Sequence, residues 1–211
     1  MKLYNYFRSG TSHRLRIALN LKGLDYEYVV VNLFKEEHLQ DRFKKINPQG
    51  FVPALDVDGT VLIQSPAIIE WLEEKYPYPP LLPSHSLARQ HVRAIAAIVS
   101  SDIHPLNNRR VLQHLRKDFG ASEDAIHQWC GQWIAEGFDT IESLLSQDKH
   151  RQGFCFGSAP TMADVYLIPQ IESARRFKVE LEKWPNILAI EKNCLDLNSF
   201  RLASPSLQVD A

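Results

Sequence analysis

The chain contains 211 residues, of which 45% are hydrophobic and 23% charged, and its formal net charge is −1 at pH 7. Such a chain can bury a substantial core in one or two domains, and its composition is typical of a globular protein. A net charge near zero excludes a broad basic field for binding nucleic acid or an anionic membrane. No apolar run approaches the roughly 18 residues of a transmembrane helix, and the N-terminal residues show no signal-peptide pattern. We therefore expect no nucleic-acid and no membrane binding.

Cysteine and histidine usage bears on the compartment and on metal binding. The three cysteines, Cys130, Cys155 and Cys194, are odd in number and widely spaced. This pattern argues against a disulfide framework and for a reducing, cytoplasmic setting. The eight histidines show no spacing typical of zinc ligands, so we expect no metal site.

The N-terminal part of the chain alternates between predicted strands and helices. A β-α-β crossover makes the first two strands parallel, and a tight turn at Asp58-Gly59 makes the last two antiparallel. This order predicts a thioredoxin-like α/β domain over residues 1–82. Its elements follow the order β-α-β-α-β-β-α and are expected at 2–7, 15–22, 26–31, 36–45, 52–57, 61–63 and 65–76.

A proline-dense segment, 76–83, comes next and is typical of a semi-rigid linker. After it, apolar residues recur at helical spacing, which predicts an all-α domain over residues 83–211. Pro105 should interrupt the first helix of this domain, and Thr161 and Asp164 have the spacing of a capping box. The helices are expected at 88–99, 126–144 and 161–177.

The stretch Val52-Pro53 indicates a site that binds peptide backbone. Proline lacks the amide that a sheet interior needs, so Pro53 belongs at the beginning or edge of a strand. A cis peptide bond here would turn the amide and carbonyl of Val52 outward. These groups can then pair with the backbone of a small extended peptide, as in strand addition.

Gln64-Ser65-Pro66 begins the next helix, with Ser65 expected at the cap and Pro66 at the first helical position. Free amides and the positive end of the helix dipole make this position suited to a carboxylate. A peptide clamp beside a carboxylate site indicates a small, acidic peptide as ligand, and glutathione fits that description.

A polar loop, Arg8-Ser9-Gly10-Thr11-Ser12, precedes the first helix, and its residues 9–12 are called the hydroxyl loop. One of its hydroxyl residues, Ser9, Thr11 or Ser12, is expected to cap the helix; alternatively, one of these hydroxyls holds a thiolate with the help of the helix dipole. No cysteine precedes Cys130, so this domain has no sulfur of its own for thiol–disulfide exchange. Any sulfur chemistry must therefore use a sulfur that the ligand brings.

Several cationic residues are candidates for contacting an anionic ligand. For any one of them taken alone, a solvated surface position is the default expectation, because charged side chains are mostly exposed. The sequence leaves the same choice open for His38 and His104. The arginines in question are Arg8, Arg109, Arg110 and Arg176.

The motifs of this chain resemble those of the zeta-class glutathione transferases. The loop of that class usually reads Ser-Ser-Cys-Ser where this chain has Ser9-Gly10-Thr11-Ser12, and a threonine cannot form the adducts that a cysteine can. The resemblance covers essentially the whole chain and implies a homodimer with the transferase architecture. It rests on 7–19, Asn47-Pro48, 52–55, Gln64-Ser65, 67–70, 102–105, 161–164 and Arg176-Phe177.

The resemblance implies glutathione-dependent cis–trans isomerisation of maleylpyruvate or maleylacetoacetate, two dicarboxylate keto acids, in the catabolism of aromatic compounds. The thiolate of glutathione would add to the conjugated double bond and let it rotate, while arginines bind the carboxylates. Carried over residue by residue, the resemblance assigns Ser9, Thr11 and Arg8 to catalysis. The glutathione site would comprise His38, Gln49, Val52, Gln64, Ser65, His104 and Asn108, and the substrate site Arg8, Arg109, Arg110 and Arg176.

Two other functions stay open. The first is a general glutathione transferase or dehalogenase acting on small anionic electrophiles, which the arginines also suit. The second is a non-catalytic module of the same fold that binds other proteins. Such a module need not keep Arg8, the hydroxyl loop and Gln64-Ser65 together, and glutathione-affinity retention would distinguish it.

Overall fold

The computed structural model describes residues 1–211 and divides the chain into two compact units. The first unit combines Met1–Leu81 with the C-terminal segment Asp196–Ala211, and the second comprises Leu82–Leu195. None of the helices combines the length and the apolar character that a bilayer span requires.

The first unit is built on a four-stranded sheet with the order β2-β1-β3-β4. Strand β1 pairs in parallel with β2 and antiparallel with β3, and β3 pairs antiparallel with β4. This mixed sheet confirms the predicted thioredoxin-like arrangement. The strands are β1 (Lys2–Asn5), β2 (Glu27–Val30), β3 (Ala54–Val57) and β4 (Thr60–Ile63).

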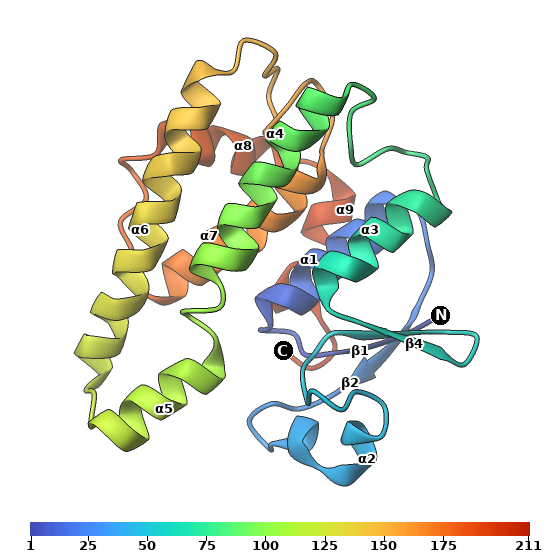
Figure 1. Cartoon of the computed structure of the whole chain (residues 1–211), viewed down its shortest axis with the longest axis vertical. Coiled ribbons are helices and arrows are strands. Elements are labelled where there is room, and N and C mark those ends of the chain that lie inside the picture. Colours follow the sequence, from blue (N-terminus) through green and yellow to red (C-terminus); the bar gives the residue numbers. More distant parts are fainter. The chain divides into compact units, whose positions relative to one another are not determined.

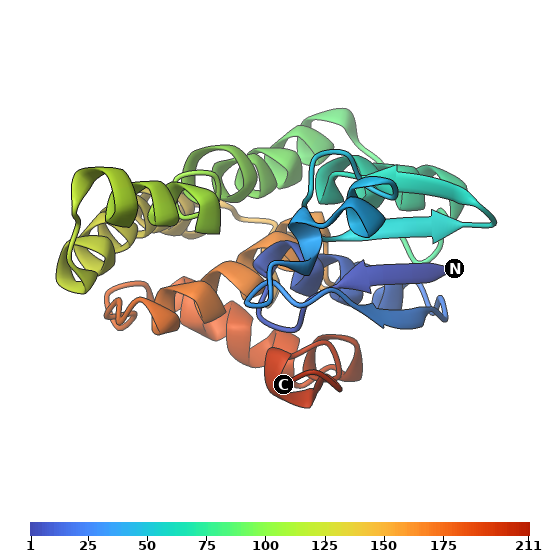
Figure 2. The same ribbon diagram turned by 90° about the horizontal axis from the view of Figure 1, so that it is seen from below.

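Helices cover both faces of this sheet. Helices α1 (Gly10–Leu21) and α3 (Ser65–Lys75) lie side by side on one face, and α2 (Asp41–Lys44) lies on the other (Figures 1 and 2). The core between the sheet and helices α1 and α3 is apolar and fully buried, because the sheet and both helices direct their hydrophobic side chains into it. It includes Leu3, Leu15, Leu19, Leu55, Ile68, Ile69 and Leu72.

The single helix predicted over 36–45 is wrong, since the structure has two short helices there. These are η1 (Glu37–Leu39), a 3₁₀ turn, and α2. Gln40 separates them with extended backbone angles (φ −75°, ψ 149°), and Glu36 enters the first turn from the left-handed region (φ 55°). Neither residue can therefore continue a helix across the segment.

The end of the chain belongs to the first unit rather than to the helical domain that the sequence predicted for 83–211. Helix α9 (Asn198–Arg201) packs against α1, and the turn η3 (Pro205–Leu207) follows it (Figure 2). The Asn20 side-chain amide donates to the Ser199 carbonyl at 3.0 Å, and the Arg16 Nε donates to the Ala203 carbonyl at 3.0 Å. These long-range contacts hold the segment on α1.

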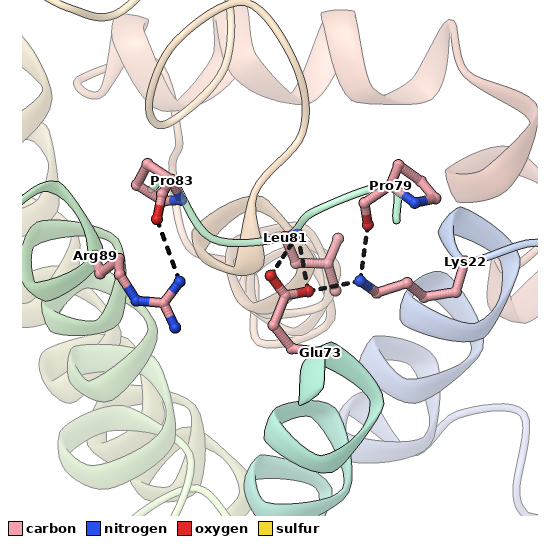
Figure 3. Close-up of polar contacts among 6 residues, drawn as sticks. All are labelled: Lys22, Glu73, Pro79, Leu81, Pro83 and Arg89. Atoms are coloured by element: carbon pink, nitrogen blue, oxygen red, sulfur yellow. Dashed lines mark hydrogen bonds and ion pairs between the residues drawn. The ribbon is translucent and has the colours of Figure 1, made fainter. Parts of the chain in front are cut away.

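The start of the linker is held on the first unit by a buried ion pair (Figure 3). The Lys22 Nζ donates to the Glu73 Oε2 at 2.6 Å and to the Pro79 carbonyl at 2.7 Å. The Leu81 amide donates to both Glu73 oxygens, at 3.0 and 3.1 Å. Within the second unit, the Arg89 Nη1 donates to the Pro83 carbonyl at 3.2 Å.

The second unit is entirely helical, as predicted. A π-helical turn, η2 (Ile98–Ile103), extends the first helix, and the chain stops being helical around Pro105. Gly137 allows η2 to approach, since a Cβ there would lie 2.3 Å from the Ile103 Cδ1. The predicted Thr161/Asp164 capping box is confirmed. The helices are α4 (Ser86–Ala97), α5 (Arg109–Phe119), α6 (Glu123–Gln147), α7 (Met162–Arg176) and α8 (Pro185–Leu195).

Candidate functional site

The hydroxyl loop lies at the N-terminus of α1, but the helix begins earlier than predicted, because Gly10, Thr11 and Ser12 already form its first turn. Ser9 is the cap residue: its backbone is extended, and its Oγ accepts a hydrogen bond from the Ser12 amide at 3.2 Å. The Ser9 amide in turn donates to the Tyr6 carbonyl at 3.0 Å. The loop is thus anchored at the positive end of the α1 dipole, where an anion is stabilised.

The hydroxyls of Ser9 and Thr11 form a directed chain. The Thr11 hydroxyl donates to the Val52 carbonyl at 2.9 Å, and its oxygen lies 2.9 Å from the Ser9 Oγ. Because Thr11 has one hydroxyl proton and gives it to Val52, Ser9 is the donor in the contact between the two hydroxyls. A rotation of the Ser9 hydroxyl alone would aim its proton at a different acceptor.

The loop before β3 presents the backbone of Val52. The Asn47 side-chain amide donates to the Phe51 carbonyl at 2.7 Å, and its Oδ1 accepts from the Gln49 amide at 3.0 Å. The Val52–Pro53 peptide bond is cis, the conformation that the sequence analysis considered for this bond. The Val52 amide makes no hydrogen bond within the chain and is available to a ligand. The motif Asn47-Pro48 was noted in the sequence, but the hydrogen bonds by which the Asn47 side chain holds this loop were not predicted.

Gln49 and Gln64 meet at the edge of this loop. The Gln64 Nε2 donates to the Gln49 Oε1 at 2.6 Å, and Gln64 is held in the left-handed region with φ 68°. A non-glycine residue rarely adopts this conformation, which costs about 1–3 kcal/mol and is typical of ligand sites. The segment of His38 also lies here, since a Cβ on Gly50 would come within 3.0 Å of the His38 carbonyl oxygen.

Ser65 is the first residue of α3, and Gln64, not Ser65, occupies the cap position. The Ser65 Oγ is buried and has no hydrogen-bond partner in the chain. Buried hydroxyls are nearly always paired, so an orphaned one beside the free amides of a helix N-terminus indicates a bound polar group. A carboxylate is the group that this donor set favours.

Arg8 is exposed, and its guanidinium carbon lies 5.7 Å from the centre of the Phe34 ring. Phe34 is itself 62% exposed and stacks edge-on against Tyr6. The ring holds the cation beside the hydroxyl loop without neutralising it, which leaves its charge for an anionic ligand. The sequence showed Arg8 but not the aromatic ring on which it rests.

The second unit carries the other predicted site residues on two segments. His104 follows η2, and Asn108 caps α5, its Oδ1 accepting from the Arg110 amide at 3.1 Å. Arg109 and Arg110 form the first turn of α5, so this segment brings four predicted residues together. Arg176 lies apart in the sequence, at the end of α7. Its neighbour Arg175 is already engaged in a two-pronged ion pair with Glu191.

None of the chain's cysteines can serve as a reactive thiolate. Cys130, Cys155 and Cys194 are all free and buried. Burial raises the pKa of Cys130 to about 12 and also raises the pKa values of Cys155 and Cys194. Sulfur chemistry in this molecule therefore depends on a thiol from elsewhere.

Two family models match the chain: the N-terminal domain of glutathione S-transferases over residues 8–75 and their C-terminal domain over residues 108–190. This chain belongs to the glutathione S-transferase family. The transferase is 62% identical to the maleylpyruvate isomerase of Ralstonia sp, with both chains covered completely. It is 50% identical to the maleylacetoacetate isomerase of Pseudomonas aeruginosa, covering all of this chain and 98% of that one.

Solved structures agree with this assignment. The holo structure of a maleyl pyruvate isomerase described as a zeta-class bacterial transferase has a TM-score of 0.99, 62% identity and complete coverage of both chains. The maleylacetoacetate isomerase of Methylobacterium extorquens, solved with bound malonate and glutathione, has a TM-score of 0.96 at 36% identity, covering 100% of this chain and 99% of that one. The zeta class predicted from the motifs is thereby confirmed.

Proposed function

We propose that this transferase is a glutathione-dependent cis–trans isomerase that converts maleylpyruvate or maleylacetoacetate to the fumaryl isomer. The observation that carries this function is the identity of 62% to a maleylpyruvate isomerase along the entire chain. Two groups support the glutathione part of the proposal: the Val52 amide ahead of β3 and the Ser65 Oγ at the start of α3.

The residues of the first unit fit glutathione. The Val52 amide and carbonyl suit the backbone of its cysteinyl residue, as in strand addition. The orphaned Ser65 Oγ, the amides at the start of α3 and the Gln64 side chain suit the γ-glutamyl carboxylate. Gln49, which bonds Gln64, and His38, whose segment lies at Gly50, extend this site, and we assign His104 and Asn108 to it as well.

The hydroxyl loop lowers the cost of keeping sulfur ionised. Bound glutathione supplies the thiolate that adds to the conjugated double bond of the substrate and leaves again after the bond has rotated. Ser9 is the hydroxyl that donates to this sulfur, since it can turn its proton away from Thr11 while Thr11 stays on Val52. The α1 dipole acts in the same direction, and Thr11 fixes the position of the Ser9 oxygen.

The arginines provide local charge for a substrate with two carboxylates. Arg8, beside the hydroxyl loop, faces the charge that develops near the reacting carbon. Arg110 and Arg176, with Arg109 as a further contact, bind the distal carboxylate, because guanidinium groups pair with carboxylates through two parallel hydrogen bonds. Arg175 is excluded from this role by its ion pair with Glu191.

We further propose that the protein is a homodimer and works in the cytoplasm, where its three free cysteines would stay reduced. The runner-up activity, glutathione transfer to anionic electrophiles such as α-halo acids, uses the same arginines and the same thiolate. Side-by-side rates with maleylpyruvate, maleylacetoacetate and an α-halo acid decide between them. Isomerisation of either maleyl compound faster than halide release supports the proposal, and halide release without isomerisation refutes it.

A further inference from the structure

Arg16 is a fully buried cation in the middle of α1. Its Nη1 donates to the Asn5 Oδ1 at 3.0 Å, its Nη2 to the Phe7 carbonyl at 3.1 Å, and its Nε to the Ala203 carbonyl at 3.0 Å. A buried charge is tolerated only where such partners compensate for lost hydration. One guanidinium therefore joins the end of β1 to the C-terminal segment.

Asp210, near the end of the chain, also bonds the backbone of Phe7. Its Oδ2 accepts from the Phe7 amide at 3.1 Å, and its Oδ1 accepts from the Tyr28 hydroxyl at 2.5 Å. Burial and the bond to Asp210 both raise the pKa of Tyr28, so its hydroxyl remains a donor. Both backbone groups of Phe7 are thus held by charged side chains, the carbonyl by Arg16 and the amide by Asp210.

Phe7 immediately precedes Arg8 and Ser9. A shift of its peptide would move the Arg8 backbone and the cap hydroxyl of Ser9, whose place on α1 depends on bonds of about 3 Å to Ser12 and Tyr6. Misplacement of a reacting group by about 1 Å can cost as much as a hundredfold in rate. The C-terminal segment therefore bears on the geometry of the thiolate loop although it contributes no group to it.

We propose that Asp210 is a positioning residue, which holds the Phe7 peptide and through it the Ser9 hydroxyl and the Arg8 side chain. The inference rests on the proposed function. Its consequence is that the ionisation of bound glutathione depends on a carboxylate in the last turn of the chain.

The test compares Asp210→Asn with two matched controls. Asparagine is uncharged and has one acceptor oxygen in place of two, so it can keep at most one of the two bonds that the Asp210 carboxylate oxygens accept separately, and that bond loses its charged acceptor. Tyr28→Phe removes only the tyrosine bond to Asp210. Gln208→Ala removes the bonds of Gln208 to the Leu202 and Ser204 carbonyls and so loosens the segment without touching Phe7.

Three readouts apply: hydrogen exchange at the Phe7 amide, the thiol pKa of bound glutathione from its ultraviolet thiolate absorbance, and steady-state kinetics. In Asp210→Asn we expect faster exchange at Phe7, a bound thiol pKa about one unit higher and a kcat about tenfold lower with little change in KM for glutathione. In both control variants, the exchange at Phe7, the bound thiol pKa and the kinetic constants should stay near those of the parent protein.

An unchanged thiol pKa in a folded Asp210→Asn protein would overturn the inference, and so would an equal rise in Gln208→Ala. The thiol titration needs bound glutathione but no isomerisation. A protein that isomerises neither maleyl compound would therefore refute the proposed function while leaving this titration able to test the role of Asp210.

Discussion

Replacing Ser65 by alanine should separate ligand binding from stability. The Ser65 Oγ is buried and bonds no atom of the chain, so its removal should leave the melting temperature unchanged or slightly raised. A hydrogen bond to a charged group contributes roughly 1.5–3 kcal/mol, and its loss should weaken glutathione binding about ten- to a hundredfold. Calorimetric titration with glutathione and thermal unfolding of the free protein measure the two quantities.

Ser122→Ala is the matched control for this experiment. Ser122 caps α6, and its Oγ accepts from the Ala125 amide at 3.2 Å, so its loss should cost about 1 kcal/mol of stability. Glutathione affinity should not change in this variant. The reasoning is refuted if Ser65→Ala binds glutathione as the parent does, or if it loses as much stability as Ser122→Ala.

Four further predictions can be tested. Arg176→Ala should raise KM for the maleyl substrate about tenfold with a smaller effect on kcat. Arg175 pairs with Glu191, so Arg175→Ala should leave KM unchanged, and equal effects of the two substitutions would contradict the assignment. Arg8→Ala should lower kcat more than it raises KM, and parent-like kinetics would exclude Arg8 from the reaction. Asp164→Ala should destabilise the protein by about 3–5 kcal/mol in denaturant unfolding, because three buried donors lose their acceptor; less than about 1 kcal/mol would be inconsistent with the capping box. The proposed homodimer should sediment as such at micromolar concentration, and a monomer would disprove it.

Much of the fold follows from local patterns. The turn at Asp58-Gly59 and the β-α-β order are sufficient to define the sheet, because hairpins and right-handed crossovers have few alternatives. The first and last residues of the helices follow less directly from the sequence. The dipeptide Ser65-Pro66 suggested that Ser65 caps the helix, but in the structure Ser65 is already the first helical residue. That one-residue difference matters, because a capping hydroxyl is satisfied by its own helix whereas the Ser65 Oγ is not.

The part of the site that the sequence could not predict depends on contacts between residues far apart in the chain. Nothing near Asp210 indicates that its carboxylate accepts from the Phe7 amide, and nothing near Arg16 indicates that it bonds the Ala203 carbonyl. One feature of the sequence could have indicated such contacts: Arg16 lies within an apolar stretch of the first helix. If Arg16 is buried, its guanidinium requires hydrogen-bond acceptors from another segment. Which segment supplies them is set by tertiary packing.

The catalytic sulfur comes from glutathione, since Cys130, Cys155 and Cys194 are buried and their pKa values are raised. The most direct test measures the isomerisation of maleylpyruvate and maleylacetoacetate by enzyme dialysed free of thiols, before and after glutathione is added back. We predict no turnover above the uncatalysed rate before addition and saturable activity after it, with S-methylglutathione unable to replace glutathione. Undiminished isomerisation by the thiol-free enzyme would contradict the account.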